Sequence, residues 1–280
     1  MLCQPLHAGP RKGWMMTTIK LPKKVQERIV AGLKRYQPIV GKLRERDISE
    51  ADTVTVIKDM LSEIFGYDKY AELTSEQQIR GTFCDLAVRV EGKVYYLAEV
   101  KSAGTNLNDN HIRQAVNYGA HQGIEWIILS NALEWRLYRI RFGQPIDWNL
   151  VYTLDIGSLS SRSADDLGKL YLLCRESISS DALVDFHRQA QILNRFVIAE
   201  LMQGETMLAA LRREFRRLFG GLKVSESELA DLLTTGVMKR DVLDGDAAKE
   251  AKTLVKKAAN MANRKTAKAA TADPAARPIA

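Results

Sequence analysis

The sequence lacks most of the features that mark disulfide-stabilised and membrane proteins. It has three cysteines in 280 residues, Cys3, Cys84 and Cys174, and no two of them form a CxxC pair. This scarcity argues against a disulfide framework and a thiolate zinc site, and it fits a reducing cytoplasm. No apolar run is long enough to span a bilayer, and the first residues contain no apolar segment of a secretory signal. We therefore predict a cytoplasmic protein without a membrane-spanning segment.

A second absence concerns nucleotide-driven motors. The sequence contains no G-x-x-x-x-G-K-[ST] phosphate loop and no internal repeat. The chain is therefore not expected to translocate along a nucleic acid by itself. With 46% hydrophobic and 27% charged residues, its composition is that of a soluble globular protein, long enough for one good-sized domain and an appendage.

The net charge of +7 is concentrated at the two ends of the chain. Residues 1–46 hold 11 Lys/Arg and two Asp/Glu, residues 249–280 hold eight and two, and the stretch between them has a net charge of −8. Basic ends are a footprint of nucleic-acid binding, but a solvated helix face and a soluble tail explain them equally well. The candidate nucleic-acid contacts lie on the first predicted helix and are Lys23, Lys24, Lys34 and Arg35.

The apolar pattern predicts an α/β fold, in which a mixed sheet has helices on its faces and a helical region follows. Ser49 is a good N-cap for the second helix, and Glu91-Gly92-Lys93 is the turn between the two strongest strands. The predicted helices are 21–46, 49–65, 109–121, 164–177, 181–203, 206–219 and 226–234. The predicted strands are 69–76, 83–90, 94–101, 126–131, 135–140 and 150–154.

Composition divides the chain into parts. Residues 1–20 are expected to be a disordered N-terminal extension, and residues 21–157 form the α/β domain. The serine-rich stretch 158–163 is a linker candidate, and a helical region follows over 163–245. The tail, 246–280, is rich in Ala and Lys and is expected to be largely disordered, with a frayed helix that is followed by disorder.

Charged residues in the two strongest strands form the candidate site. Asp85 lies in the first strand, and Glu99 and Lys101 lie two residues apart in the second, so they point to the same face. Charge in a buried strand is costly unless it is paired. Two carboxylates and the Val100 carbonyl suit Mg²⁺ or Mn²⁺ rather than Zn²⁺. A structural ion pair of Lys101 with either acid is the alternative.

Several stretches together resemble the PD-(D/E)xK nuclease superfamily, and more narrowly the N-terminal nuclease domain of the R subunit of type I restriction enzymes. The resemblance covers about residues 45–141, and Cys84 replaces the proline that names the motif. The matching stretches are Ser49–Thr53, Phe65–Asp68, Gly81–Val88, Ala98–Lys101, Gln114–Tyr118, Trp126–Asn131 and Glu134–Tyr138. The resemblance implies a restriction-endonuclease-like fold over 21–157 in a stand-alone relative without a helicase motor.

The resemblance also implies roles for individual residues. Asp85 and Glu99 would bind the metal and Lys101 would assist the attacking water. Glu50 would join the metal shell, although a solvated acid in the first turn of a helix explains it as well. Gln114 and Tyr118 would line the active-site cleft, and a helix surface pair is the alternative.

Other residues that could serve chemistry have simpler explanations. His111 and His121 are interpreted as ordinary polar positions, because the proposed reaction needs neither. Trp126, Trp135 and Tyr138 could stack on bases, but their apolar neighbours favour core packing.

The leading hypothesis is a Mg²⁺- or Mn²⁺-dependent nuclease that acts on DNA, with RNA left open. The alternative is a non-catalytic nucleic-acid-binding or assembly module of a restriction or defence system. A third reading is a basic regulator that binds nucleic acid through residues 21–46. A separate motor or methyltransferase subunit is an expected partner, and the helical region could form a homodimer.

Overall fold

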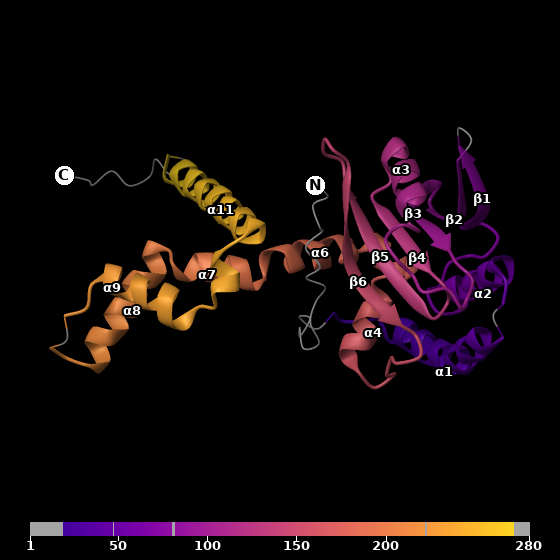
Figure 1. Ribbon diagram of the computed structural model, residues 1–280, viewed down its shortest axis with the longest axis horizontal. Helices are drawn as coiled ribbons and strands as arrows, with labels where there is room; N and C mark the ends of the chain where they lie inside the picture. Colours follow the sequence, from indigo (N-terminus) through magenta and orange to yellow (C-terminus); the bar gives the residue numbers. More distant parts are fainter. Residues whose placement is uncertain (1–18, 47, 80–81, 222, 272–280) are drawn as a thin grey trace, which may run out of the picture. The chain divides into compact units, whose positions relative to one another are not determined.

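A computed structural model describes residues 19–46, 48–79, 82–221 and 223–271 (Figure 1). Contacts divide the chain into two units, Met1–Asp185 and Phe186–Ala280. Nearly all of the predicted extension 1–20, with Cys3, lies outside the described residues. Among the described helices, none combines the length and the apolar character needed to cross a bilayer.

The first unit is built on a six-stranded mixed sheet with the strand order β1-β2-β3-β4-β5-β6. All neighbouring strands are antiparallel except β3 and β4, which are parallel. This confirms the predicted α/β fold with a mixed sheet. The strands are β1 (Leu73–Ile79), β2 (Thr82–Val90), β3 (Lys93–Val100), β4 (Trp126–Ser130), β5 (Glu134–Arg141) and β6 (Asp147–Asp155).

Local hydrogen bonds explain where β1 begins. The strand was predicted at 69–76, but it starts at Leu73. The Asp68 side chain accepts hydrogen bonds from the backbone N–H groups of Tyr70 and Ala71, each at 2.8 Å. This side-chain turn competes with strand pairing, so the residues before Leu73 are not part of the sheet.

A two-residue turn aligns the strands that carry the site. Val90 pairs with Lys93, and the intervening Glu91 and Gly92 both have positive φ, 52° and 80°. Positive φ at both central positions is the backbone of the tight hairpin turn that matches strand twist. The turn therefore starts the pairing, and a register shift between Val88 and Arg89 sets the pairing of the far ends of β2 and β3.

Helices cover both faces of the sheet. On one face lies α3 (Arg113–Gln122), whose Ala115 and Val116 belong to the same buried cluster as Leu97 of β3. Alternate residues of a strand point to opposite faces, and on the other face the Tyr96 hydroxyl donates to the Leu172 carbonyl at 3.4 Å. Helices α1 (Lys23–Glu45) and α2 (Glu50–Glu63) complete the layers.

The aromatic residues of the central strands belong to the core. Trp126, Trp135 and Tyr138 are 4%, 1% and 1% exposed. The Trp135 ring lies 5.3 Å from the Phe65 ring, which follows α2 in the chain. Core packing is therefore confirmed for these three residues, and their burial contradicts a role in stacking on bases.

The first unit extends beyond the predicted linker at 158–163. It continues to Asp185 and includes α4 (Ala164–Tyr171) and α5 (Arg175–Ser179). The Tyr67 hydroxyl donates to the Leu173 carbonyl at 2.9 Å, and Arg175 pairs with Glu72 at 2.7 Å. These long-range contacts correct the predicted boundary, because serine-rich composition does not reveal what the following helices pack against.

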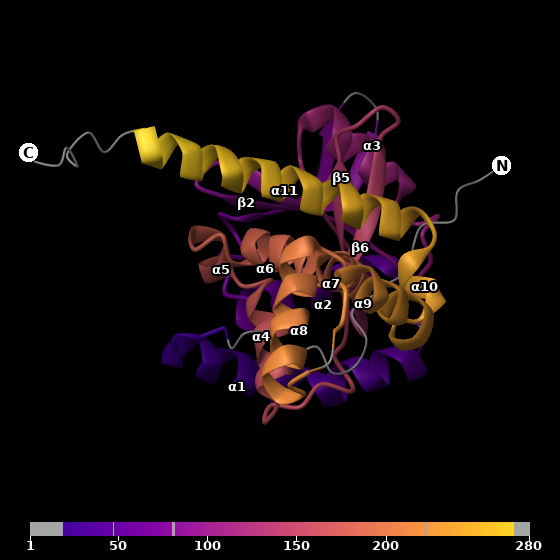
Figure 2. The same ribbon diagram turned by 90° about the vertical axis from the view of Figure 1, so that its left-hand side faces the viewer.

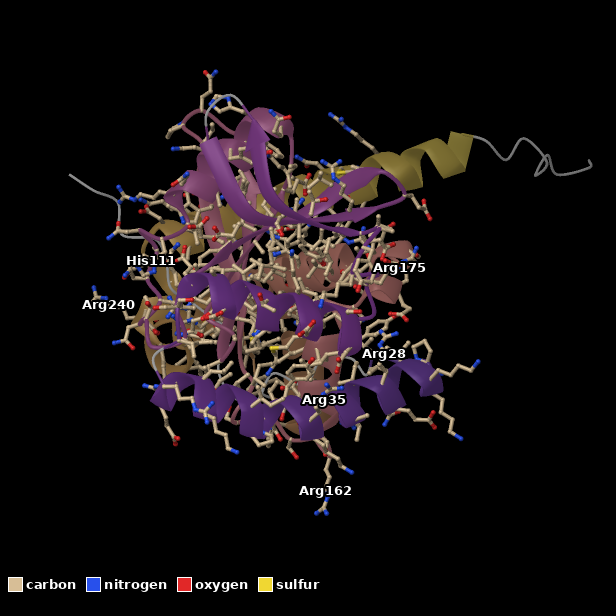
Figure 3. The ribbon with its side chains drawn as sticks, turned by 90° about the vertical axis from the view of Figure 1, so that its right-hand side faces the viewer. Arg28, Arg35, His111, Arg162, Arg175 and Arg240 are labelled. Carbon is tan, nitrogen blue, oxygen red and sulfur yellow. The ribbon has the colours of Figure 1, made fainter. Side chains whose placement is uncertain are left out.

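A partly buried guanidinium joins α1 to α5. Arg28 makes two hydrogen bonds of 2.7 Å to the Glu176 carboxylate, and it also donates to the carbonyls of Ile64 at 3.0 Å and Phe65 at 3.3 Å (Figure 3). Gly66, with φ +82°, leaves room for it, since a Cβ there would lie 2.5 Å from the guanidinium carbon. The flat, forked donor set suits this bidentate geometry.

We expect Arg28→Ala to lower the free energy of unfolding by about 3 kcal/mol, because Glu176 and two carbonyls lose their donor. Arg28→Lys should recover less than half of the loss, since an ammonium cannot reproduce the fork. Urea denaturation followed by circular dichroism measures both values. A loss below about 0.5 kcal/mol for Arg28→Ala would show that the pair is merely a surface contact.

The second unit consists of helices. Its small core contains Leu208, Leu229 and Leu233. The predicted helix 181–203 is divided at Asn194, whose side chain caps the helix that follows by accepting from the Phe196 and Val197 N–H groups. The elements are α6 (Ala182–Ile192, which begins in the first unit), α7 (Arg195–Met202), α8 (Glu205–Leu218), α9 (Glu226–Leu232), the π-helical turn η1 (Leu233–Val237), α10 (Arg240–Leu243) and α11 (Asp246–Thr271).

Helix α11 corrects the expectation that residues 246–280 are largely disordered. Asp246–Thr271 form one helix, drawn in yellow in Figure 2, and residues 272–280 lie outside the described part of the chain. Alanine has the highest helix propensity of all residues, and a helix of this length exceeds the roughly 12–15 residues needed for stability without packing. Low hydrophobicity had suggested disorder, but propensity decides here.

The two described cysteines are expected to be inert in the native protein. Cys84 and Cys174 are completely buried, and burial raises the pKa of each thiol to about 12. At pH 8 only about one thiol in ten thousand would be a thiolate. A Cys3→Ser variant should therefore bind almost no Ellman reagent when folded and two equivalents in urea. Rapid labelling of the folded variant would contradict this burial.

Candidate active site

The candidate site lies at the carboxyl end of β3, where the sheet changes from antiparallel to parallel pairing. The paired residues of β2 and β3 end at Leu86 and Ala98, and those of β3 and β4 end at Val100 and Ser130. The Lys101 N–H donates to the Ser130 carbonyl at 2.9 Å and extends β3 by one residue. Residues beyond these last pairs lie outside the regular backbone hydrogen bonding of the sheet, and several of their side chains converge.

Asp85 is held where β2 and β3 cease to pair. Its carboxylate accepts a hydrogen bond of 2.7 Å from the Val100 N–H. A side-chain oxygen thus occupies the position that a backbone carbonyl would occupy in a continuing ladder. This contact fixes the Asp85 carboxylate beside the β3 segment that carries Glu99 and Lys101.

The Lys101 ammonium is surrounded by oxygens. Its Nζ lies 2.7 Å from Glu99 Oε1, 2.9 Å from the Val100 carbonyl oxygen and 3.4 Å from Glu50 Oε2. Glu50 comes from a distant part of the sequence and is positioned because α2 begins there. The Ser49 side chain caps this helix by accepting from the Asp52 N–H, as predicted.

Burial makes these charges interact strongly. Glu99 is 8% exposed, and burial raises its pKa against the hydrogen bond from Lys101, with the charges of Asp85 and Glu50 adding to the rise. Burial alone would lower the pKa of Lys101, but the hydrogen bond to Glu99 and the three carboxylates outweigh it, so the pKa is raised. Two carboxylates, Glu99 and Glu50, thus contact the one ammonium, and the charge of the Asp85 carboxylate acts on it without a direct contact.

The arrangement fits a hard divalent cation. Within the described residues, no group of three or more His, Cys, Asp or Glu side chains is placed to hold a metal. Mg²⁺ sites, however, use one or two carboxylates and are completed by water and substrate phosphates. The Lys101 ammonium shows that Glu99, Val100 and Glu50 can direct oxygens toward one positive centre. One or two of the carboxylates of Asp85, Glu99 and Glu50, with the Val100 carbonyl, would be enough to hold such an ion.

The two predicted residues of α3 differ in their environments. Gln114 is exposed, whereas Tyr118 is 4% exposed and belongs to the same apolar cluster as Cys84, the neighbour of Asp85. Burial raises the pKa of the Tyr118 hydroxyl, so it remains a neutral group near physiological pH. The helix surface pair is therefore not what the structure contains, because one member is buried.

The loop between β3 and α3 brings a residue that was interpreted as an ordinary polar position. The pKa of His111 is lowered by partial burial and then by the charges of Lys101 and Arg136, which places it near the candidate site. A helix was predicted from residue 109, but α3 begins at Arg113. Asp109 accepts from the Tyr138 hydroxyl at 2.9 Å. The loop follows the carboxyl end of β3, and this position was the only signal in the sequence that could have placed His111 near the candidate site.

The predicted nucleic-acid contacts lie exposed on α1. Lys23, Lys24 and Lys34 are exposed. Arg35, labelled in Figure 3, pairs with Glu63 of α2 at 2.9 Å. The pair leaves the Arg35 side chain 63% exposed. All four residues are therefore available to a polyanion, although Arg35 would share its charge with Glu63.

Comparison with known proteins finds no matching family model, no matching curated protein and no matching solved structure. The protein is accordingly described by its own architecture, a six-stranded mixed sheet flanked by helices and followed by further helices. Its candidate site is a cluster of three carboxylates and one lysine at the carboxyl end of a central strand.

Proposed function

We propose that the protein is a Mg²⁺- or Mn²⁺-dependent nuclease that hydrolyses phosphodiester bonds in DNA, on a restriction-endonuclease-like core. The observation that carries the proposal is the convergence of Asp85, Glu99, Lys101 and Glu50 from three elements on one point. Glu99 is buried among these groups, and a buried carboxylate beside two further acids is costly in a purely structural role. This arrangement suits a site in which a divalent cation takes over the oxygen contacts that the Lys101 ammonium makes.

The residues would divide the chemistry among themselves. Asp85 and Glu99, with the Val100 carbonyl and Glu50, would hold the ion. Bound Mg²⁺ lowers the pKa of a coordinated water and polarises a phosphoryl oxygen. Lys101 would donate hydrogen bonds to the attacking water or to the charge that develops on the phosphate oxygens. Gln114 and Tyr118 are proposed to line the substrate path.

The proposed substrate follows from charge. A carboxylate site repels phosphates unless cations accompany them, and the exposed lysines of α1 would supply part of the attraction. DNA is the first choice, and RNA is a matched comparison. The absent phosphate loop favours a nuclease that acts alone or with a separate motor or methyltransferase subunit of a restriction system. A homodimer through the second unit remains a prediction.

The test is hydrolysis by the purified full chain. Linear and circular DNA and single-stranded RNA would be incubated with Mg²⁺, Mn²⁺ or EDTA and resolved on denaturing gels. We expect metal-dependent cleavage of DNA that disappears in EDTA and in Asp85→Ala and Lys101→Ala. Cleavage that survives both substitutions would come from a contaminant or another site and would overturn the assignment.

A second function is favoured by one observation. Lys101 already contacts Glu99, Glu50 and the Val100 carbonyl, so the cluster has an internal cation. A non-catalytic nucleic-acid-binding or assembly module could retain this cluster as an ion-pair network. It would bind DNA without cleaving it, and Asp85→Ala would not change the affinity measured by fluorescence anisotropy.

A further inference from the structure

Helix α11 carries charge of almost one sign. Its 26 residues contain seven Lys or Arg and two acids, and both acids, Asp246 and Glu250, lie in the first five residues. Asp246 pairs with Lys249 at 3.3 Å. From residue 251 to 271 the helix contains six basic residues and no acid. On a typical exposed helix acids and bases alternate and form pairs. The sequence of α11 from 251 to 271 does not have this pattern.

The basic side chains are free in the described part of the helix. Lys252, Lys256, Lys257 and Arg264 are all exposed, and no ion pair is found for them among the described residues. The helix packs on α7 and α10 within the second unit, and Ala251 is 4% exposed. At about 100° per residue, Lys252 and Lys256 lie about 100° and 140° from Ala251 in one direction, and Lys257 and Arg264 lie about 120° and 140° from it in the other. All four therefore lie within an arc of about 140° on the side away from Ala251, which we call the α11 basic face.

This face is maintained against electrostatic repulsion. Lys252 and Lys256 are four residues apart, and like charges at this spacing destabilise a helix. Alanine-rich composition compensates through helix propensity. A polyanion would remove the repulsion, and the face from Lys252 to Arg264 spans about 18 Å. Duplex DNA presents about 11 phosphate charges over that length.

The other residues of α11 indicate which kind of polyanion the helix would bind, a lipid surface or a nucleic-acid backbone. A helix that lies on an anionic membrane needs large apolar residues opposite its basic face. From Lys252 to Thr271 the large apolar residues are Leu254, Val255 and Met261, and the others are mainly Ala, Asn, Thr and basic residues. Only Leu254 and Met261 of these three are exposed. Two separate apolar side chains are a small anchor for a helix of this charge, which favours a nucleic-acid backbone over a lipid surface.

We propose that the α11 basic face is a DNA-backbone binding surface that holds substrate without reading its sequence. The inference uses the proposed function only to choose DNA as the polyanion, and binding through this face does not require hydrolysis. It adds a second contact surface, in the second unit, to the lysines of α1.

The test compares two variants that lose the same charge. The first replaces the α11 basic face and carries Lys252→Gln, Lys256→Gln, Lys257→Gln and Arg264→Gln. The control carries Lys93→Gln, Arg162→Gln, Lys223→Gln and Lys239→Gln, all at exposed positions outside α11. Glutamine keeps the helix, because its propensity is close to that of lysine, and circular dichroism verifies this.

Binding of a fluorescent duplex of about 30 base pairs is followed by anisotropy in EDTA, over about 50–200 mM KCl. We expect the α11 variant to lower the slope of log K against log salt by about 3 and to weaken binding at least about tenfold at the lower salt. The control should change the slope by less than about 1. The proposal would be overturned if both variants lost affinity and salt slope equally, or if neither variant lost any.

Two further outcomes separate this inference from the proposed nuclease activity. Wild-type protein that binds vesicles of phosphatidylserine and phosphatidylcholine but not duplex DNA would identify a membrane surface and overturn the inference. Salt-dependent binding through α11 without cleavage in Mg²⁺ would leave the inference standing and overturn the nuclease. If the wild-type protein cleaves DNA and the α11 variant binds DNA as tightly as the wild type, the nuclease proposal stands and this inference is overturned.

Discussion

Asp85→Asn is expected to slow Mg²⁺-dependent hydrolysis of DNA by at least about a thousandfold, which corresponds to about 4 kcal/mol of transition-state stabilisation. The substitution removes the negative charge that would hold the ion. It keeps a side-chain oxygen that can accept the 2.7 Å hydrogen bond from the Val100 N–H. The rate is measured from the loss of intact DNA on gels, and thermal unfolding should show little change.

The matched control is Asp147→Asn. Asp147 is an acid of β6 that pairs with Arg141, outside the candidate site. Its rate should stay within about twofold of wild type, because an exposed ion pair contributes little. If Asp147→Asn and Asp85→Asn slow hydrolysis to the same extent, Asp85 has no special role. Loss of the native fold in Asp85→Asn would redirect the test to Glu99→Gln.

Lys101→Met is expected to lower the free energy of unfolding by about 3 kcal/mol in EDTA, because it leaves buried Glu99 beside the Asp85 and Glu50 carboxylates without a counter-charge. Mn²⁺ should then stabilise this variant more than it stabilises the wild type. The reason is that the ammonium contacts Glu99, Val100 and Glu50 oxygens that the ion would use. Differential scanning fluorimetry with and without Mn²⁺ measures both effects.

A double variant is the control for this result. Lys101→Met with Glu99→Gln removes the acid together with its partner, so it should be more stable in EDTA than Lys101→Met alone and should gain less from Mn²⁺. A metal site is contradicted if Mn²⁺ raises the melting temperature of all three proteins equally or of none. This readout does not depend on hydrolysis.

Local sequence signals predicted the elements that support the site. The Ser49 cap, the Glu91-Gly92 turn and the apolar strands at 83–90 and 94–101 all depend on neighbours within a few residues, and the structure contains them at nearly the predicted bounds. Each signal acts through backbone geometry or through burial of alternate residues. The sheet could therefore be predicted without knowledge of long-range contacts.

Predictions that depended on packing were less accurate. The domain boundary at 158–163 failed because Glu176 and Leu173, far along the chain, bind groups in the first unit. In the tail at 246–280 a frayed helix was expected, and the structure contains a helix over 26 residues, longer than low hydrophobicity indicated. The proximity of His111 to Lys101 and Arg136 also depends on packing, and nothing near it in the sequence shows it.

By itself, the sequence determined the mixed sheet, the hairpin and the residues that could do chemistry, because periodicity and residue type are local properties. Tertiary structure alone decided that Glu50 reaches Lys101 from 51 positions away, that Val100 N–H holds Asp85 in place and that burial raises the pKa of Glu99. Distances and desolvation depend on how the elements pack, and the side-chain charges acquire their energies only in that environment.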